Sequence, residues 1–191
     1  RQITITNNNP TESLPEGYTV NFSLPTTGDS FLDNGDDIRI VFNNTFEIDR
    51  INTSSFNSPD TTLWFKIQLN ISAGGSDNNH WVYYRNSQAI SPPEQASNVY
   101  DFFDDFNDGI INPLWQQTST WIESGGIISP LSGAERPVLL LQKNYTGVYV
   151  EAMMMPNAAG FQGGILTRAQ DSNNFYDYMI ETSDRTTIYK R

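Results

Sequence analysis

The segment Tyr18-Thr19-Val20-Asn21-Phe22-Ser23-Leu24 alternates large apolar side chains with small polar ones. A period of two residues is typical of a β-strand that buries one face, and it places four side chains inward: Tyr18, Val20, Phe22 and Leu24. The segment 63–71 repeats the alternation, turn residues separate the strand candidates, and no window carries a helical stripe. The sequence therefore predicts an all-β chain of antiparallel sandwich type.

Two prolines interrupt this pattern in Ser91-Pro92-Pro93-Glu94-Gln95-Ala96-Ser97. Proline holds itself and the preceding residue in extended conformations, so we expect an exposed connector here. A length of 191 residues accommodates two small domains, which we place at residues 1–95 and 99–191. The second domain contains further strand candidates, at 120–123, 126–129, 138–141, 148–155, 163–168, 175–181 and 186–190.

Composition excludes several classes of function. Eleven basic side chains against 22 acidic ones give a net charge of −11, which disfavours binding to nucleic acid or to anionic lipid. No apolar run approaches the ~20 residues of a membrane span, and the chain contains no cysteine. The strand-like opening Arg1-Gln2-Ile3-Thr4-Ile5 lacks a leader, so we expect a piece of a longer protein.

Residues for catalysis are scarce. His80 is the single histidine, and because it follows Asp77-Asn78-Asn79 we expect it at the edge of a loop. Glycoside hydrolases of the jelly-roll type use a Glu-x-Asp-x-x-Glu strand, and the nearest segment, Glu47-Ile48-Asp49-Arg50-Ile51-Asn52, lacks the last carboxylate. The sequence therefore predicts a chain without enzymatic activity.

The densest group of oxygen ligands surrounds Phe103 and Phe106, and it comprises Asp101, Asp104, Asp105 and Asp108. Calcium takes six to eight oxygen ligands, so these carboxylates are the candidate calcium site. Phe106 stands where an EF-hand loop needs a ligand, so the loop is not of that type. A solvated strand edge whose phenylalanines pack inward is the alternative, and calcium is the one cofactor that we consider.

Exposed aromatic rings stack against sugars, and neighbouring polar groups bind the hydroxyls. Tyr176 and Tyr178 lie on one side of a predicted strand, and Arg168 lies on the preceding one, so we assign these three residues to a candidate glycan site. Asn21 and Asn70 begin Asn-x-Ser/Thr sequences and point outward on their strands, so they are candidate glycosylation sites.

Four segments of the first 95 residues resemble a family of prokaryotic surface domains of unknown function: Arg1-Gln2-Ile3-Thr4-Ile5, Gly35-Asp36-Asp37-Ile38-Arg39, Leu63-Trp64-Phe65-Lys66-Ile67 and Tyr83-Tyr84-Arg85-Asn86-Ser87. The family has glycine and proline where this chain has Arg85 and Ser87. A turn that needs a positive φ at that glycine would strain Arg85. The resemblance implies a prokaryotic cell-surface protein.

The second domain resembles the concanavalin A-like jelly roll in its laminin-G-like form, through Phe103-Asp104-Asp105-Phe106, Leu114-Trp115, Trp121–Gly126, Gly163–Arg168 and Asn173–Tyr176. Proteins of the first family often carry such a jelly roll next. About 90 residues make only part of one, which would leave edge strands exposed.

We therefore expect an immunoglobulin-like sandwich followed by an incomplete jelly roll. The expected function is that of a non-catalytic extracellular module for glycan binding or adhesion. The alternative is a structural subunit of a filament or surface layer, in which neighbouring protein subunits are joined by pairing of β-strands.

Overall fold

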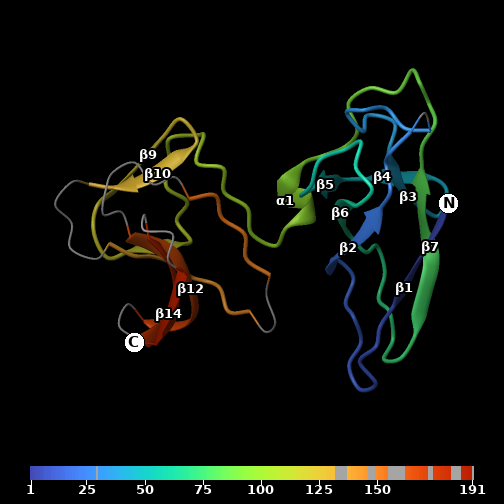
Figure 1. Cartoon of the computed structure of the whole chain (residues 1–191). Coiled ribbons are helices and arrows are strands. Elements are labelled where there is room, and N and C mark those ends of the chain that lie inside the picture. The colour runs from blue at the N-terminus through green and yellow to red at the C-terminus, as the bar shows by residue number, and fades with distance from the viewer. Residues whose placement is uncertain are drawn as a thin grey trace. The chain divides into compact units, whose positions relative to one another are not determined.

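The structure is a computed structural model, and it describes residues 1–28, 30–131, 137–145, 149–154, 162–171, 174–181 and 186–190. The chain divides into two compact units, Arg1–Phe103 and Asp104–Arg191 (Figure 1). The prediction of an all-β chain is confirmed, because the described elements are strands in antiparallel sheets together with one short helix, α1 (Ala96–Val99).

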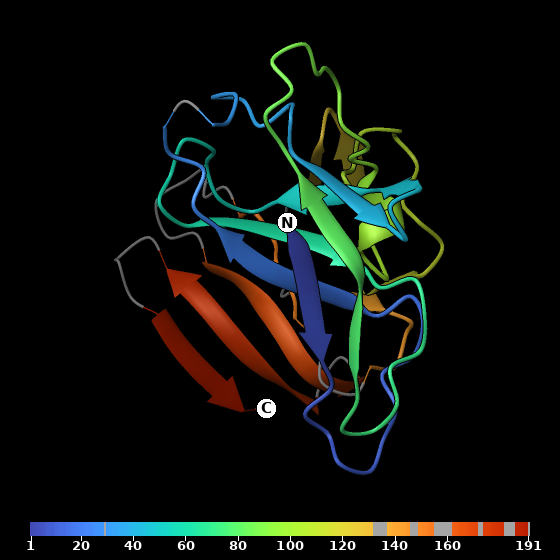
Figure 2. The same ribbon diagram turned by 90° about the vertical axis from the view of Figure 1, so that its right-hand side faces the viewer.

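The first unit contains two antiparallel sheets. One has the order β1-β7-β3-β4 and is built from β1 (Gln2–Thr6), β7 (Ser76–Tyr83), β3 (Arg39–Phe42) and β4 (Phe46–Ile48). The other has the order β2-β6-β5 and is built from β2 (Thr19–Leu24), β6 (Thr61–Lys66) and β5 (Arg50–Asn52). In Figure 2, the dark blue β1 and the green β7 lie side by side at the front of this unit.

The core of the first unit takes side chains from both sheets. Its buried cluster contains residues of β2, β3, β6 and β7 and one residue of the loop before β3. These residues are Leu24, Ile40, Leu63, Phe65, Val82 and, from the loop, Ile38. The alternation in 63–71 correctly placed Leu63 and Phe65. Tyr18 was wrongly placed inward: it is 45% exposed, because β2 begins only at Thr19.

His80 lies in this core and not at the edge of a loop, so that expectation was wrong. The preceding segment Asp77-Asn78-Asn79 belongs to β7, which begins at Ser76. The imidazole is fully buried, and its Nδ1 lies 2.6 Å from Oδ2 of Asp77. The aromatic rings of Phe42 and Phe65 lie against it, with centroids 5.0 and 5.3 Å away. The Asp77–His80 pair is therefore a buried contact within the core.

The proline-containing segment is held against the first unit and does not stand free. The backbone N–H of Arg50 donates to the carbonyl of Pro93 at 3.0 Å, and the N–H of Gln95 donates to Oδ1 of Asp49 at 2.6 Å. Val99 of α1 is fully buried. These contacts explain why the first unit continues to Phe103.

The second unit consists of small antiparallel groups of strands. One pair joins β9 (Trp121–Ser124) to β10 (Ile127–Pro130), and another joins β8 (Trp115–Gln117) to β11 (Leu139–Leu141). A three-stranded sheet has the order β12-β13-β14, with β12 (Gln162–Asp171), β13 (Asn174–Glu181) and β14 (Thr186–Lys190). The strand predicted at 148–155 is wrong for residues 149–154, which form no strand and leave Met153 fully exposed.

Candidate functional site

The outer surface of the β1-β7-β3-β4 sheet carries two aromatic side chains on one strand. Val82 of β7 is buried in the core, so its neighbours Trp81 and Tyr83 point to the opposite face. Tyr83 is 46% exposed, and Trp81 is partly exposed. We call this surface the Trp81 face and define it by five residues: Gln2, Arg39, Glu47, Trp81 and Tyr83.

The register of the sheet places polar side chains on both sides of the aromatic rings. Trp81 stands opposite Gln2 of β1 on one side and opposite Val41 of β3 on the other. Val41 in turn faces Glu47 of β4. Tyr83 stands opposite Arg39 of β3. The rings therefore occupy an inner strand of the sheet, and groups that form hydrogen bonds flank them.

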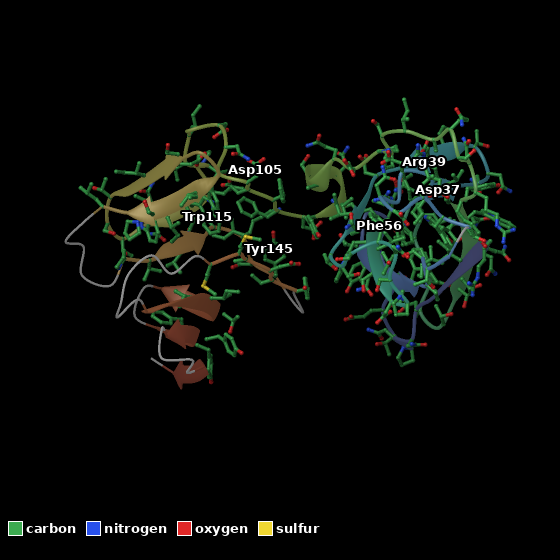
Figure 3. The ribbon with its side chains drawn as sticks, turned by 45° about the horizontal axis from the view of Figure 1, so that its top comes forward. Asp37, Arg39, Phe56, Asp105, Trp115 and Tyr145 are labelled. Atoms are coloured by element: carbon green, nitrogen blue, oxygen red, sulfur yellow. The ribbon has the colours of Figure 1, made fainter. Side chains whose placement is uncertain are left out.

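Contacts within the first unit fix these polar groups. Arg39 (Figure 3) forms an ion pair with Glu47 and donates from Nη2 to the carbonyl of Ile90 at 2.9 Å. The hydroxyl of Tyr83 donates to Oδ1 of Asn44 at 2.8 Å. The amide of Gln2 donates to the carbonyl of Asn78, also at 2.8 Å. A ligand would meet side chains whose positions are already set, which limits the entropy lost on binding.

The geometry of the Trp81 face suits a flat ligand that is apolar on its face and polar at its rim. Residues two apart on a strand are separated by roughly 7 Å, so Trp81 and Tyr83 offer two ring surfaces in a row. A pyranose presents C–H groups on its faces and hydroxyls at its rim. Aromatic side chains combine a large apolar body with a polar tip, and the flanking residues supply donors and acceptors.

The sequence predicted a strand at Trp81–Tyr84 but did not reveal this face. The signal was present in Trp81-Val82-Tyr83, because a buried valine between two aromatic residues places both rings on the other side. What the sequence did not reveal was the neighbouring strands. Gln2, Arg39 and Glu47 come from three distant segments, and only the order β1-β7-β3-β4 brings them to the two rings.

The turn after β7 has a positive φ at the position where the resembled family has glycine, so Arg85 is strained there. Arg85 has a φ of +77°, in the left-handed region that glycine tolerates best. Its backbone N–H donates to Oδ2 of Asp37 at 2.8 Å, and Oδ1 of Asp37 accepts the N–H of Leu32 at 2.9 Å (Figure 3). Asp37 is 2% exposed. This buried carboxylate joins two loops and holds the arginine in its strained conformation.

The four candidate calcium ligands are divided between the two units, with Asp101 in the first and the other three in the second. Asp101 forms an ion pair with Lys66 in the first unit, at 3.5 Å. The other three each accept the N–H of the residue two positions ahead, and so stabilise turns of their own loop: Asp104, Asp105 and Asp108. Among the described residues, no group of three or more His, Cys, Asp or Glu side chains is arranged to hold a metal ion. The calcium site at Asp101, Asp104, Asp105 and Asp108 therefore stays a prediction.

The tyrosine pair lies where the sequence placed it. Tyr176 and Tyr178 are 37% and 46% exposed, and both point to one side of β13, the middle strand of its sheet. The register sets Tyr176 opposite Thr167 and Lys190, and Tyr178 opposite Ile165 and Ile188. Arg168 lies in β12, where the register shifts, and its side chain lies outside the described residues.

The two candidate glycosylation residues are both exposed. Asn21 lies in β2, as expected. Asn70 lies beyond the end of β6, which stops at Lys66, and its side-chain oxygen accepts the backbone N–H of Glu16 at 2.7 Å. Asn70 therefore belongs to a loop and not to the long strand that the alternation predicted.

Comparison with known proteins identifies a domain of unknown function, DUF2341, at residues 34–124. The match begins inside the first unit and ends at the last residue of β9, so it includes parts of both units. No curated protein and no solved structure matches the chain. Within the described part of the chain, no helix has the length and apolar character required to cross a membrane.

Proposed function

We propose that the chain is a non-catalytic, extracellular module of a prokaryotic cell surface, and that it binds neutral glycans on the Trp81 face. The observation that carries this proposal is the pair of aromatic side chains Trp81 and Tyr83, set in a row on an inner strand and flanked by fixed polar groups. Adhesion follows if the glycan belongs to another cell or to a surface.

The charges on the Trp81 face favour a neutral ligand. The chain as a whole carries a net charge of −11, which disfavours anionic ligands in general. Within the face, the one cation, Arg39, is paired with the one anion, Glu47. A neutral sugar can form hydrogen bonds with both members of such a pair, and it does not have to separate the two charges.

The exposed pair Tyr176 and Tyr178 supports a second glycan-binding surface on β13. We infer that the two surfaces belong to an immunoglobulin-like domain and a laminin-G-like jelly roll, in keeping with the resemblances of the two halves. Two weak sites on one chain would raise its avidity for a polymeric glycan.

Binding to a panel of insoluble and soluble polysaccharides tests the proposed function. Trp81→Ala and Tyr83→Ala are expected to weaken binding about tenfold each, since each removes one stacking surface. The matched control is Trp64→Ala, which removes a tryptophan from the middle strand of the other sheet, where its indole N–H donates to Thr53. Equal losses in all three folded variants, or no binding by the wild type, would refute the Trp81 face as a glycan site.

A structural subunit is the alternative function, and one observation favours it. Among the described residues, β12 and β14 each pair with β13 alone, so each has one edge without a partner strand. Such edges accept strands from other chains. Electron microscopy and sedimentation of the purified chain would decide: ordered filaments formed without any glycan would make this function the leading one.

A further inference from the structure

A buried carboxyl group in the second unit lacks the partners that its burial demands. Glu123, on β9, is 8% exposed. Its Oε1 accepts the backbone N–H of Gly109 at 3.0 Å. Its Oε2 is enclosed, and no group among the described residues forms a hydrogen bond with it. An unpartnered carboxylate oxygen is costly to bury, so an additional group is required at this position.

The nearest side chain makes the requirement stronger. The carboxyl group of Asp108 lies beside that of Glu123, and Asp104 adds a further negative charge nearby. Two carboxylates offer acceptors only, so they need a proton or a cation between them. The ion pairs formed by described side chains involve Asp101, Glu47 and Asp77, and none involves Asp104, Asp108 or Glu123.

The loop that carries Asp108 is fixed against the hairpin that carries Glu123. The N–H of Gly126, in the β9–β10 turn, donates to the carbonyl of Phe106 at 2.9 Å. A Cβ at Gly126 would lie 3.0 Å from Oδ1 of Asn107 and 3.7 Å from the carbonyl oxygen of Asp105. Trp115 donates from its indole to Oδ2 of Asp104 at 2.8 Å (Figure 3). Loop and hairpin thus meet closely at Gly126.

Burial, the contact with Asp108 and the charge of Asp104 all act in one direction on Glu123. The loss of solvation is the largest of these effects, and together they disfavour a bare negative charge on Glu123, whereas the N–H of Gly109 favours it. A cation placed between the two carboxyl groups would reverse this preference and favour both in their ionised form.

We propose that Asp108 and Glu123 bind one divalent cation, with Ca²⁺ as the best fit. The ligands are hard oxygen atoms, which suit Ca²⁺ or Mg²⁺ and not the metals that prefer nitrogen or sulfur. Ca²⁺ has the more flexible geometry and accepts water or backbone carbonyls for the rest of its shell. This site differs from the four-aspartate site of the sequence analysis, because it includes Glu123 and excludes Asp101.

The cation would fasten the loop 104–109 to β9. Because binding to the folded state alone stabilises that state, the second unit should gain stability in proportion to the logarithm of the cation concentration above the dissociation constant. The proposal does not depend on the Trp81 face, which belongs to the other unit.

Titration of the EDTA-treated full chain with CaCl₂ at pH 7 tests the proposal, by calorimetry and by thermal unfolding. Wild type is expected to show saturable binding of one ion and a rising Tm. Glu123→Gln keeps the shape and supplies an amide donor to Asp108, so it should weaken Ca²⁺ binding about tenfold or more. The matched control Asp105→Asn makes the same charge change at an exposed position of the same loop and should bind as wild type does.

Three outcomes would overturn the cation site. In the first, Ca²⁺ leaves the Tm unchanged, whereas a change from pH 7 to pH 5 raises the Tm. This result would mean that a proton, and not a cation, lies between the carboxyl groups of Asp108 and Glu123. In the second, Glu123→Gln and Asp105→Asn weaken binding equally, which means that Ca²⁺ responds to net charge. In the third, Glu123→Gln binds Ca²⁺ as tightly as wild type.

Discussion

The two units bury charged side chains in opposite ways. In the first unit, Asp37 accepts two backbone N–H groups, and the guanidinium of Arg50 donates to the carbonyls of Gly35 and Ile38 at 2.8 and 3.2 Å. In the second unit, Glu123 meets one N–H group and another carboxyl group. Burial beside hydrogen-bond partners of the complementary kind stabilises a fold, whereas burial of like charges together requires a ligand or a proton.

Arg50 shows how the first unit tolerates a cation in its core. Arg50 is only 1% exposed. The loss of solvation lowers the pKa of its guanidinium, and the negative charge of Glu94 acts in the opposite direction. The guanidinium carbon lies 5.1 Å from the centroid of the Phe56 ring (Figure 3). Backbone carbonyls and an aromatic face thus take the place of a carboxylate partner, and they fix the loop that contains Gly35.

The largest effect is expected at Asp37, a buried carboxylate that accepts two backbone N–H groups from different loops. Asp37→Ala removes the acceptor of the N–H groups of Leu32 and Arg85, and two unpartnered groups should cost about 4 kcal/mol of unfolding free energy. Urea unfolding measures the change. Asp36→Ala is the control: its carboxylate accepts from the exposed amide of Asn34, so a loss within about 0.5 kcal/mol is expected. Equal losses of unfolding free energy in Asp37→Ala and Asp36→Ala would contradict the stabilising role of the buried carboxylate.

A smaller but still large effect is expected at Gly35, which has a φ of +72°. A Cβ at this position would lie 2.5 Å from the ring of Phe56, and that ring cannot move without disturbing Arg50. Steric overlap and backbone strain together should make Gly35→Ala cost about 3 kcal/mol. Gly17→Ala separates the two causes, because Gly17 has a φ of +81° but open space around it, and it should cost about 1 kcal/mol.

In the second unit, the burial of Glu123 beside another carboxyl group predicts that the stability of the protein rises as the pH falls. Burial raises the pKa of Glu123 above its ordinary value, so its contribution to stability is complete below that ordinary value and declines as the pH rises through the raised pKa. In EDTA, acidification from pH 7 towards pH 5 should therefore stabilise wild type relative to Glu123→Gln. Parallel pH profiles for the two proteins would mean that Glu123 ionises as an ordinary carboxylate.

The sequence was informative where one strand determines its own environment. Alternation in 63–71 correctly predicted the burial of Leu63 and Phe65, and Tyr176 and Tyr178 lie on one exposed side as their spacing required. It failed where distant segments meet. His80 followed three polar residues and was expected at a loop edge, but β7 carries all of them into a sheet between β1 and β3. The sequence also did not reveal the partners of Glu123 or the polar residues beside Trp81, because these residues come from other segments of the chain.

The smallest effect is expected at Arg85, where the first unit combines backbone strain with a partnered charge. A left-handed conformation costs a residue with a side chain about 1 kcal/mol, and glycine avoids that cost but loses about 0.5–1 kcal/mol of conformational entropy on folding. Arg85→Gly keeps the N–H that donates to Asp37 and removes an exposed contact with Ser30 at 3.1 Å. The change in unfolding free energy should lie within about 0.5 kcal/mol of zero.

The control variant Arg85→Ala keeps the backbone strain and should be no more stable than wild type. A loss of several kcal/mol in Arg85→Gly would show that the arginine side chain, and not the carboxylate of Asp37, holds this turn in its left-handed conformation.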